Sequence, residues 1–180
     1  MASETSQRVA LVTGAGSGIG KAVAMGLLQD GFQVVLTGRR PDPLEDVVAA
    51  AQAAGQHAWA IPADVRDEHS VQALFDAIEK RYGRLDVLFN NAGVNAPAVP
   101  MDELPVQSWK DVIDTNVTGV FLCARAAFGL MRRQKPQGGR IINNGSISAH
   151  APRPLSSPYT ASKHAVLGLT RTIALDGRDF

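Results

Sequence analysis

The chain has 180 residues, of which 45% are hydrophobic and 19% charged, a composition typical of a folded domain rather than a disordered segment. Its 18 basic and 17 acidic residues give a formal net charge of +1, which disfavours a nucleic acid or an anionic membrane as partner. The lone cysteine, Cys123, excludes an intramolecular disulfide and a cysteine-rich zinc site, and the four histidines lack metal-ligand spacing, so we expect no bound metal.

Residues 1–7 are polar and lack the basic start and the apolar run of a secretory signal. No window approaches the roughly 18 apolar residues that span a bilayer. We therefore expect a flexible tail at 1–7, one domain over 8–180, and a soluble cytoplasmic protein without a membrane partner.

Short apolar runs alternate with amphipathic segments from residue 8 onward. They predict buried strands at 8–13, 32–37, 57–61, 85–90 and 140–143, and helices at 19–29, 44–54, 71–82, 106–132 and 158–175. In the first helix Ile19, Val23 and Leu27 are expected to face the core, together with Met25 and Gly26. Alternating strands and helices imply an α/β fold, a doubly wound parallel sheet with helices on both faces. The fifth strand is expected near an uncovered edge of that sheet.

A glycine-rich turn from Thr13 to Gly20 joins the first strand to the first helix, with the spacing GxxxGxG. Such glycines let the backbone turn sharply and let a pyrophosphate approach the amides of a helix N-terminus. The turn is not a P-loop, because Ala22 lacks the hydroxyl that would hold Mg²⁺. A dinucleotide site is predicted, with a purely structural corner as the alternative. Its candidate ligands are Gly14, Ser17, Gly18, Ile19 and Gly20.

The end of the second strand bears on the choice of dinucleotide. A ribose-binding acid is expected about 20 residues beyond the glycines, but this chain has Gly38 followed by Arg39 and Arg40. A guanidinium can bind a 2′-phosphate through paired hydrogen bonds. We therefore expect NADP(H) to be favoured over NAD(H), with Arg39 as a ligand. Two arginines on a solvated loop are the alternative.

Four signals in this order resemble the short-chain dehydrogenase/reductase family over nearly the whole chain. They are the glycine turn, Asp64-Val65, Asn90-Asn91-Ala92-Gly93, and Ser146 with the Tyr159-Thr160-Ala161-Ser162-Lys163 segment. The resemblance implies a Rossmann-type domain in which Asp64 and Val65 flank the adenine. It also implies that Asn91, Ala92 and Gly93 line the cofactor cleft. A helix cap at Asp64 and Asx turns at Asn90 and Asn91 are the structural alternatives.

Tyr159 and Lys163 are four residues apart in a predicted helix and therefore share one face, which alone is typical of an ordinary helix surface. A nearby ammonium favours a phenolate, so Tyr159 is the candidate general acid and base. Ser146 is the candidate donor to the substrate oxygen, with Ser148 as the alternative; the resemblance favours Ser146, because in the family this serine lies thirteen residues before the tyrosine. The resemblance implies that Lys163 and Tyr159 contact the nicotinamide ribose side of the cofactor. It further implies that Asn116 serves a proton relay.

These features predict an NADP(H)-dependent oxidoreductase that interconverts a small carbonyl compound and a secondary alcohol. A family member that dehydrates or epimerises its substrate is one alternative, and a cofactor-binding fragment or regulator without turnover is another. Family members usually continue beyond the tyrosine–lysine helix with further strands and a substrate-covering loop, so we expect a truncated form of a longer protein. The resemblance also implies a homodimer or homotetramer.

Overall fold

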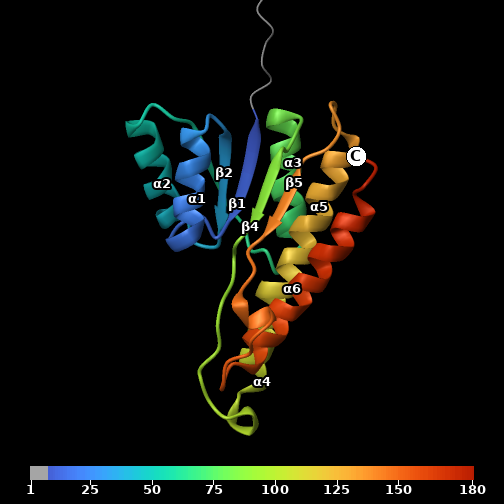
Figure 1. Cartoon of the computed structure of the whole chain (residues 1–180). Helices are drawn as coiled ribbons and strands as arrows, with labels where there is room; N and C mark the ends of the chain where they lie inside the picture. Colours follow the sequence, from blue (N-terminus) through green and yellow to red (C-terminus); the bar gives the residue numbers. More distant parts are fainter. Residues whose placement is uncertain (1–7) are drawn as a thin grey trace, which may run out of the picture.

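The computed structural model describes residues 8–180, and the tail expected at 1–7 lies outside them. Five strands form one parallel sheet in the order β3-β2-β1-β4-β5 (Figure 1). The strands are β1 (Val9–Thr13), β2 (Gln33–Gly38), β3 (Ala58–Pro62), β4 (Val87–Asn90) and β5 (Arg140–Asn143). The chain winds outward from β1 to β3 and then crosses to β4. The carboxyl ends of β1 and β4 therefore border the crevice at which α/β sheets bind ligands.

Six α-helices connect and cover the strands. They are α1 (Gly18–Gln29), α2 (Pro41–Ala53), α3 (Glu68–Tyr82), α4 (Val106–Ile113), α5 (Gly119–Arg133) and α6 (Ser157–Asp176). Helices α1 and α2 cover one face of the sheet and α3 and α5 the other, while α4 and the first turns of α6 extend beyond the carboxyl ends of the strands (Figure 1). A π-helical turn (Asp114–Thr118) joins α4 to α5, and short 3-10 turns occur at Met101–Glu103 and Ile147–Ala149.

Strand β1 divides its side chains between two cores. Val9 and Leu11 pack with side chains of α3 and α5, whereas Ala10 and Val12 pack with side chains of α1 and α2. All five residues of β1 are buried, as expected of a strand covered on both faces. Burying a valine or leucine contributes about 1.5–3 kcal/mol, so both layers hold the central strand in place.

The expected α/β fold class is confirmed, and β5 lies at an edge of the sheet as predicted. The helical region expected over 106–132 is confirmed, with the π-helical turn at Asp114–Thr118 between α4 and α5. The expected inward face of α1 is confirmed in part. Val23, Met25 and Leu27 are partly buried against the core, whereas Ile19 is 60% exposed and Gly26 is exposed. The fully buried residues of α1 are Gly20, Ala24 and Leu28. Small residues face the sheet there because the start of α1 approaches the end of β1 closely.

Candidate active site

The glycine turn positions the N-terminus of α1 against the end of β1. Gly14 and Gly18 have φ angles of 64° and 53°, in the left-handed region that favours glycine. A Cβ at residue 20 would lie 2.2 Å from the carbonyl oxygen of Gly14. Ser17, the N-cap residue, makes no capping hydrogen bond through its side chain within residues 8–180. The first amides of α1 are thus left for another acceptor, the usual property of an anion site.

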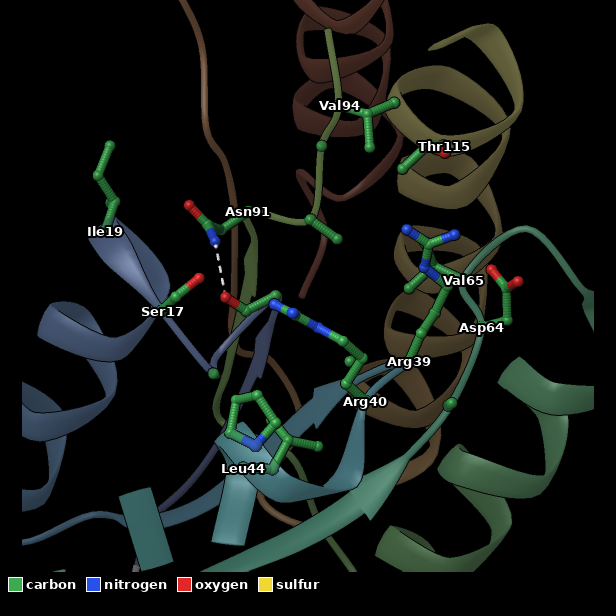
Figure 2. Close-up of a pocket in the computed structure, with 17 residues that line it drawn as sticks. Ser17, Ile19, Arg39, Arg40, Leu44, Asp64, Val65, Asn91, Val94 and Thr115 are labelled. Atoms are coloured by element: carbon green, nitrogen blue, oxygen red, sulfur yellow. Dashed lines mark hydrogen bonds between the residues drawn. The ribbon is translucent and has the colours of Figure 1, made fainter. Parts of the chain in front are cut away.

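A cavity of about 370 Å³ opens beside this turn (Figure 2). Most of the expected cofactor ligands line it. Gly18 and Gly20 shape the turn itself, and Tyr159 and Lys163 lie outside the lining. The expected residues in the lining are Gly14, Ser17, Ile19, Arg39, Asp64, Val65, Asn91, Ala92 and Gly93. Other lining residues were not among the predicted ligands, including Arg40, Pro43, Leu44, Val94 and Thr115. Of these, only Arg40 had a sequence signal, as the neighbour of Arg39.

Two arginines project into this cavity from the end of β2. Figure 2 shows Arg39 on the side of Asp64 and Val65, and Arg40 on the side of the glycine turn. Neither arginine makes an ion pair with an acid in the part of the chain that the structure describes. Both guanidinium groups therefore remain available to an anion in the cavity.

Asp64 is held by Arg66, a contact that the sequence analysis did not foresee. The Arg66 Nη2 lies 2.6 Å from Asp64 Oδ2, and Arg66 Nε donates to both carboxylate oxygens at 3.0 Å. The hydrogen bonds from Arg66, aided by the charge of Arg39, hold the pKa of the Asp64 carboxyl below its usual value. Asp64 does not cap α3; the cap is Asp67, which accepts from the Ser70 amide at 2.6 Å.

Asn91 ties the end of β4 to the end of β1. Its backbone amide and that of Ala92 each donate to Thr13 Oγ1 at 2.9 Å, and its side-chain Nδ2 donates to the carbonyl oxygens of Thr13 and Gly14 at 3.0 and 3.4 Å. The bond to Gly14 is drawn in Figure 2. Asn90 instead donates to Asn143 Oδ1 across the sheet at 2.9 Å. Both asparagines therefore cross-link strands rather than form local Asx turns.

Helix α6 carries both Tyr159 and Lys163, half-buried on one face. The Lys163 Nζ lies 5.5 Å from the centroid of the Tyr159 ring and donates to the carbonyl oxygen of Asn144 at 2.7 Å. Burial lowers the pKa of the Lys163 ammonium, and the nearby Tyr159 acts in the opposite direction. The structure thus brings together the phenol and the ammonium that the sequence analysis paired.

Ser146 follows β5 and caps the 3-10 turn Ile147–Ala149, which packs against α6. Its Oγ accepts a hydrogen bond from the Ser148 amide at 3.1 Å. Because a serine hydroxyl carries one proton besides its acceptor lone pairs, the Ser146 O–H is still able to donate. The Ser146 hydroxyl thus lies on the segment between β5 and α6, the helix that carries Tyr159 and Lys163.

Asn116 lies in the π-helical turn and is 2% exposed. Its Oδ1 accepts from the Val94 amide at 2.8 Å, and its Nδ2 donates to the Val94 carbonyl at 2.9 Å and to Ser162 Oγ at 3.3 Å. Its side chain therefore fixes the segment after β4 against α6. It does not hydrogen-bond Lys163, the neighbour of Ser162 in the sequence.

A chain of hydrogen bonds connects the lysine to the glycine turn. Lys163 donates to the Asn144 carbonyl, the Asn144 Nδ2 donates to Asn91 Oδ1 at 3.0 Å, and Asn91 donates to Gly14. Asn144 was absent from the sequence-based candidates. Its position at the carboxyl end of β5, next to Asn143, is the signal that could have identified it.

Residues 8–180 contain neither a candidate metal site nor a candidate membrane-spanning helix. No group of three or more histidine, cysteine, aspartate or glutamate side chains there could hold a metal ion. No helix in that stretch is long and apolar enough to cross a bilayer.

Comparison with known proteins supports one family. The family model of the short chain dehydrogenases matches residues 8–179. The 3beta-hydroxysteroid dehydrogenase of Mediterraneibacter gnavus is 41% identical over 170 residues, which cover 94% of this chain and 60% of that protein. A metagenomic short-chain oxidoreductase in complex with NADP has a TM-score of 0.91 at 34% identity, covering 96% of this chain and 77% of its own.

A short chain dehydrogenase/reductase from Burkholderia phymatum in complex with NAD also has a TM-score of 0.91, at 35% identity over 96% of this chain and 61% of its own. This chain thus spans about three fifths of the length of its steroid dehydrogenase relative. The family match, however, covers the sheet, the glycine turn and the tyrosine–lysine helix together. The chain belongs to the short-chain dehydrogenase/reductase family.

Proposed function

We propose that this chain carries the cofactor-binding and catalytic residues of an NADP(H)-dependent oxidoreductase that interconverts a ketone or aldehyde and an alcohol. One observation carries the proposal: the hydrogen-bonded path from Lys163 through Asn144 and Asn91 to Gly14. It joins the candidate proton-transfer residues to the candidate pyrophosphate site. A dinucleotide bound against the turn would then extend toward the Tyr159–Lys163 pair.

The cavity beside the glycine turn has the features that a dinucleotide needs. The uncapped start of α1 at Ser17 suits a pyrophosphate, and the missing Cβ at Gly20 allows the turn to approach the helix. Asp64 and Val65 line the wall on which the adenine would rest. A bound nicotinamide would supply or accept the hydride, while the chain positions it and moves the proton.

The preference for NADP(H) rests on Arg39 and Arg40. The structural neighbours bind NADP in one case and NAD in the other, so the family alone does not decide the cofactor. Both arginines line the cavity, and neither has an acidic partner in the described stretch. Asp64, the acid nearest to them in the lining, is already paired with Arg66. An unpaired guanidinium forms charge-assisted hydrogen bonds with a 2′-phosphate. Its hydrogen bond to a neutral 2′-hydroxyl is weaker.

Binding of the two reduced cofactors tests this preference. Replacing Arg39→Ala should weaken NADPH binding by roughly 10- to 100-fold, the value of a charge-assisted hydrogen bond, and should leave the NADH Kd nearly unchanged. Arg132→Ala, on the exposed surface of α5, is a control that should change neither Kd. Tighter binding of NADH than of NADPH by the unaltered protein would refute the assignment.

In the proposed reaction Tyr159 donates a proton to the carbonyl oxygen during reduction and accepts it during oxidation. The Ser146 hydroxyl donates a hydrogen bond to the same oxygen, and the Lys163 ammonium stabilises the phenolate that reduction leaves behind. We assign Asn116 a positioning role through Val94 and Ser162, because its side chain is committed to those two residues. A relay through Asn116 would have to use its backbone.

Tyr159→Phe tests the proton transfer. It should lower NADPH-dependent turnover of a carbonyl panel by about 10²- to 10⁴-fold, the usual contribution of general acid–base catalysis, with the NADPH Kd preserved. Tyr82→Phe is the matched control, because Tyr82 packs against Trp59 on the opposite side of the sheet from the cofactor residues of α1. Undiminished turnover by Tyr159→Phe would refute the role. NADPH binding without turnover by the unaltered chain would favour a regulator instead.

A further inference from the structure

A smaller hollow, of about 190 Å³, is lined by Arg153, a neighbour of the Tyr159 ring of the proposed site. Its lining comes from the segment after β4 and from the start of α6, and it shares no residue with the lining of the cofactor cavity in the described chain. Its walls are largely apolar: Met101 is 79% exposed and Leu155 is 51% exposed. Because these two exposed apolar side chains line one concave hollow rather than lying singly on the surface, they offer a ligand an apolar contact surface.

Arg153 is the only charged side chain in the lining of this hollow as described. Its guanidinium carbon lies 5.6 Å from the centroid of the Tyr159 ring, so the cation sits near the phenol on which the chemistry is proposed. No carboxylate in the described structure forms an ion pair with Arg153.

We propose that Arg153 binds a carboxylate of the substrate, so that the site prefers an oxo acid or hydroxy acid with an apolar body over its neutral counterparts. The inference rests on the proposed role of Tyr159. An arginine fork matches the two oxygens of a carboxylate and pairs with them through parallel hydrogen bonds. The Tyr159 ring lies next to the guanidinium, so one molecule several carbon atoms long can place its carboxylate on Arg153 and its carbonyl at the phenol.

The apolar part of such a substrate would lie between the carboxylate and the carbonyl. Met101 and Leu155 provide the apolar surface for it, and the hollow is large enough for a small ring or a short chain. Burying that carbon skeleton contributes affinity, whereas the guanidinium contributes selectivity for the charge. The charge preference should therefore weaken in high salt, because an exposed ion pair is screened.

The test compares three ketones that share one ring: 4-oxocyclohexanecarboxylate, its methyl ester and 4-methylcyclohexanone. With NADPH, the ratio of kcat/KM for the acid to that for the ester should exceed 10 in the unaltered protein, mostly through KM. Arg153→Gln should reduce that ratio by roughly 10- to 100-fold, and Arg153→Lys should retain part of it. The ratio is informative because general damage to the fold would lower kcat/KM for the acid and for the ester equally.

Arg171→Gln is the control, an exposed arginine on the same helix, about 18 Å further along it than Tyr159. It should leave the ratio unchanged. An acid-to-ester ratio near 1 in the unaltered protein, or one that Arg153→Gln does not reduce, would overturn the inference.

Binding without turnover separates this inference from the proposed function. The Kd of 4-oxocyclohexanecarboxylate for the protein saturated with NADP⁺ is measured by calorimetry. Arg153→Gln should weaken it by about 10-fold or more. If NADPH binds and none of the ketones is reduced, the proposed reduction is wrong, and the role of Arg153 is judged from the carboxylate Kd alone. Equal Kd values for the unaltered protein and Arg153→Gln would show that Arg153 does not bind the carboxylate.

Discussion

Gly20 offers the most direct test of how the candidate cofactor site is built. A Cβ at this position would lie 2.2 Å from the Gly14 carbonyl oxygen and 2.6 Å from Asn91 Nδ2, whereas ordinary contacts begin at 3.4 Å. In Gly20→Ala, either the turn or α1 must therefore move by about 1 Å. Overpacking of this kind costs about 1–3 kcal/mol of unfolding free energy. At about 2–4 °C per kcal/mol for a chain of this size, Tm should fall by roughly 2–12 °C.

The same displacement should be visible in ligand binding. Because Gly14 lines the cavity, we expect the NADPH Kd of Gly20→Ala to rise by more than 10-fold, equivalent to about 1.4 kcal/mol. Gly26→Ala is the control in the same helix: within residues 8–180 nothing lies within 4 Å of its added Cβ, and its Tm should rise slightly. Calorimetric unfolding and a fluorescence titration measure both quantities. A Gly20→Ala protein with unchanged Tm and Kd would refute the steric argument.

Three further predictions concern the core and the lysine. Gln134→Leu should lower the unfolding free energy by about 2–5 kcal/mol without changing the NADPH Kd. The buried Gln134 side chain accepts a hydrogen bond from the Leu85 amide and donates to the carbonyl oxygens of Leu85 and Gly138, which the variant would leave unpaired. An unchanged urea midpoint would contradict this. Burial lowers the pKa of Lys163 in the folded chain. As pH rises toward about 10.5, the folded chain therefore loses the Lys163 proton before the unfolded chain does. The stability of the unaltered protein relative to Lys163→Met should therefore increase over that range, and a flat difference in denaturation curves would be inconsistent with it. Burial raises the pKa of Cys123 to about 12, so a thiol reagent near pH 8 should react with it only after urea unfolding; rapid reaction of the folded chain would disprove the burial.

The sheet was predictable because its strands are short apolar runs separated by glycine-containing turns. The Arg140–Asn143 strand was predicted with its observed bounds, and the ends of the others differ by a few residues at most. Helix faces were harder. Ile19 looks like a core residue by hydrophobicity, but it is exposed, and the inner position at the start of α1 belongs to Gly20, where close approach to the β1 turn leaves no room for a Cβ. This requirement depends on a tertiary distance, which hydrophobic periodicity does not encode.

The candidate site was predictable where residues have a fixed spacing and unpredictable where they pair across the fold. Tyr159 and Lys163 needed only a helix to become neighbours. Asn144 and Asn91 are far apart in sequence and meet because β4 and β5 end at the same edge of the sheet. The ion pair between Arg66 and Asp64 depends on the side-chain rotamers of both residues, which the sequence does not determine.

The path from Lys163 to Gly14 has a consequence for redesign of the candidate site. The residues proposed to contact the two ends of a dinucleotide belong to one hydrogen-bonded unit, so we expect a substitution at the turn to displace the ammonium as well. The arginines after β2 stand apart from that unit, since neither is hydrogen-bonded to any member of it in the described chain. Altering cofactor preference through them should therefore leave the proton chemistry intact, whereas remodelling the glycine loop should not.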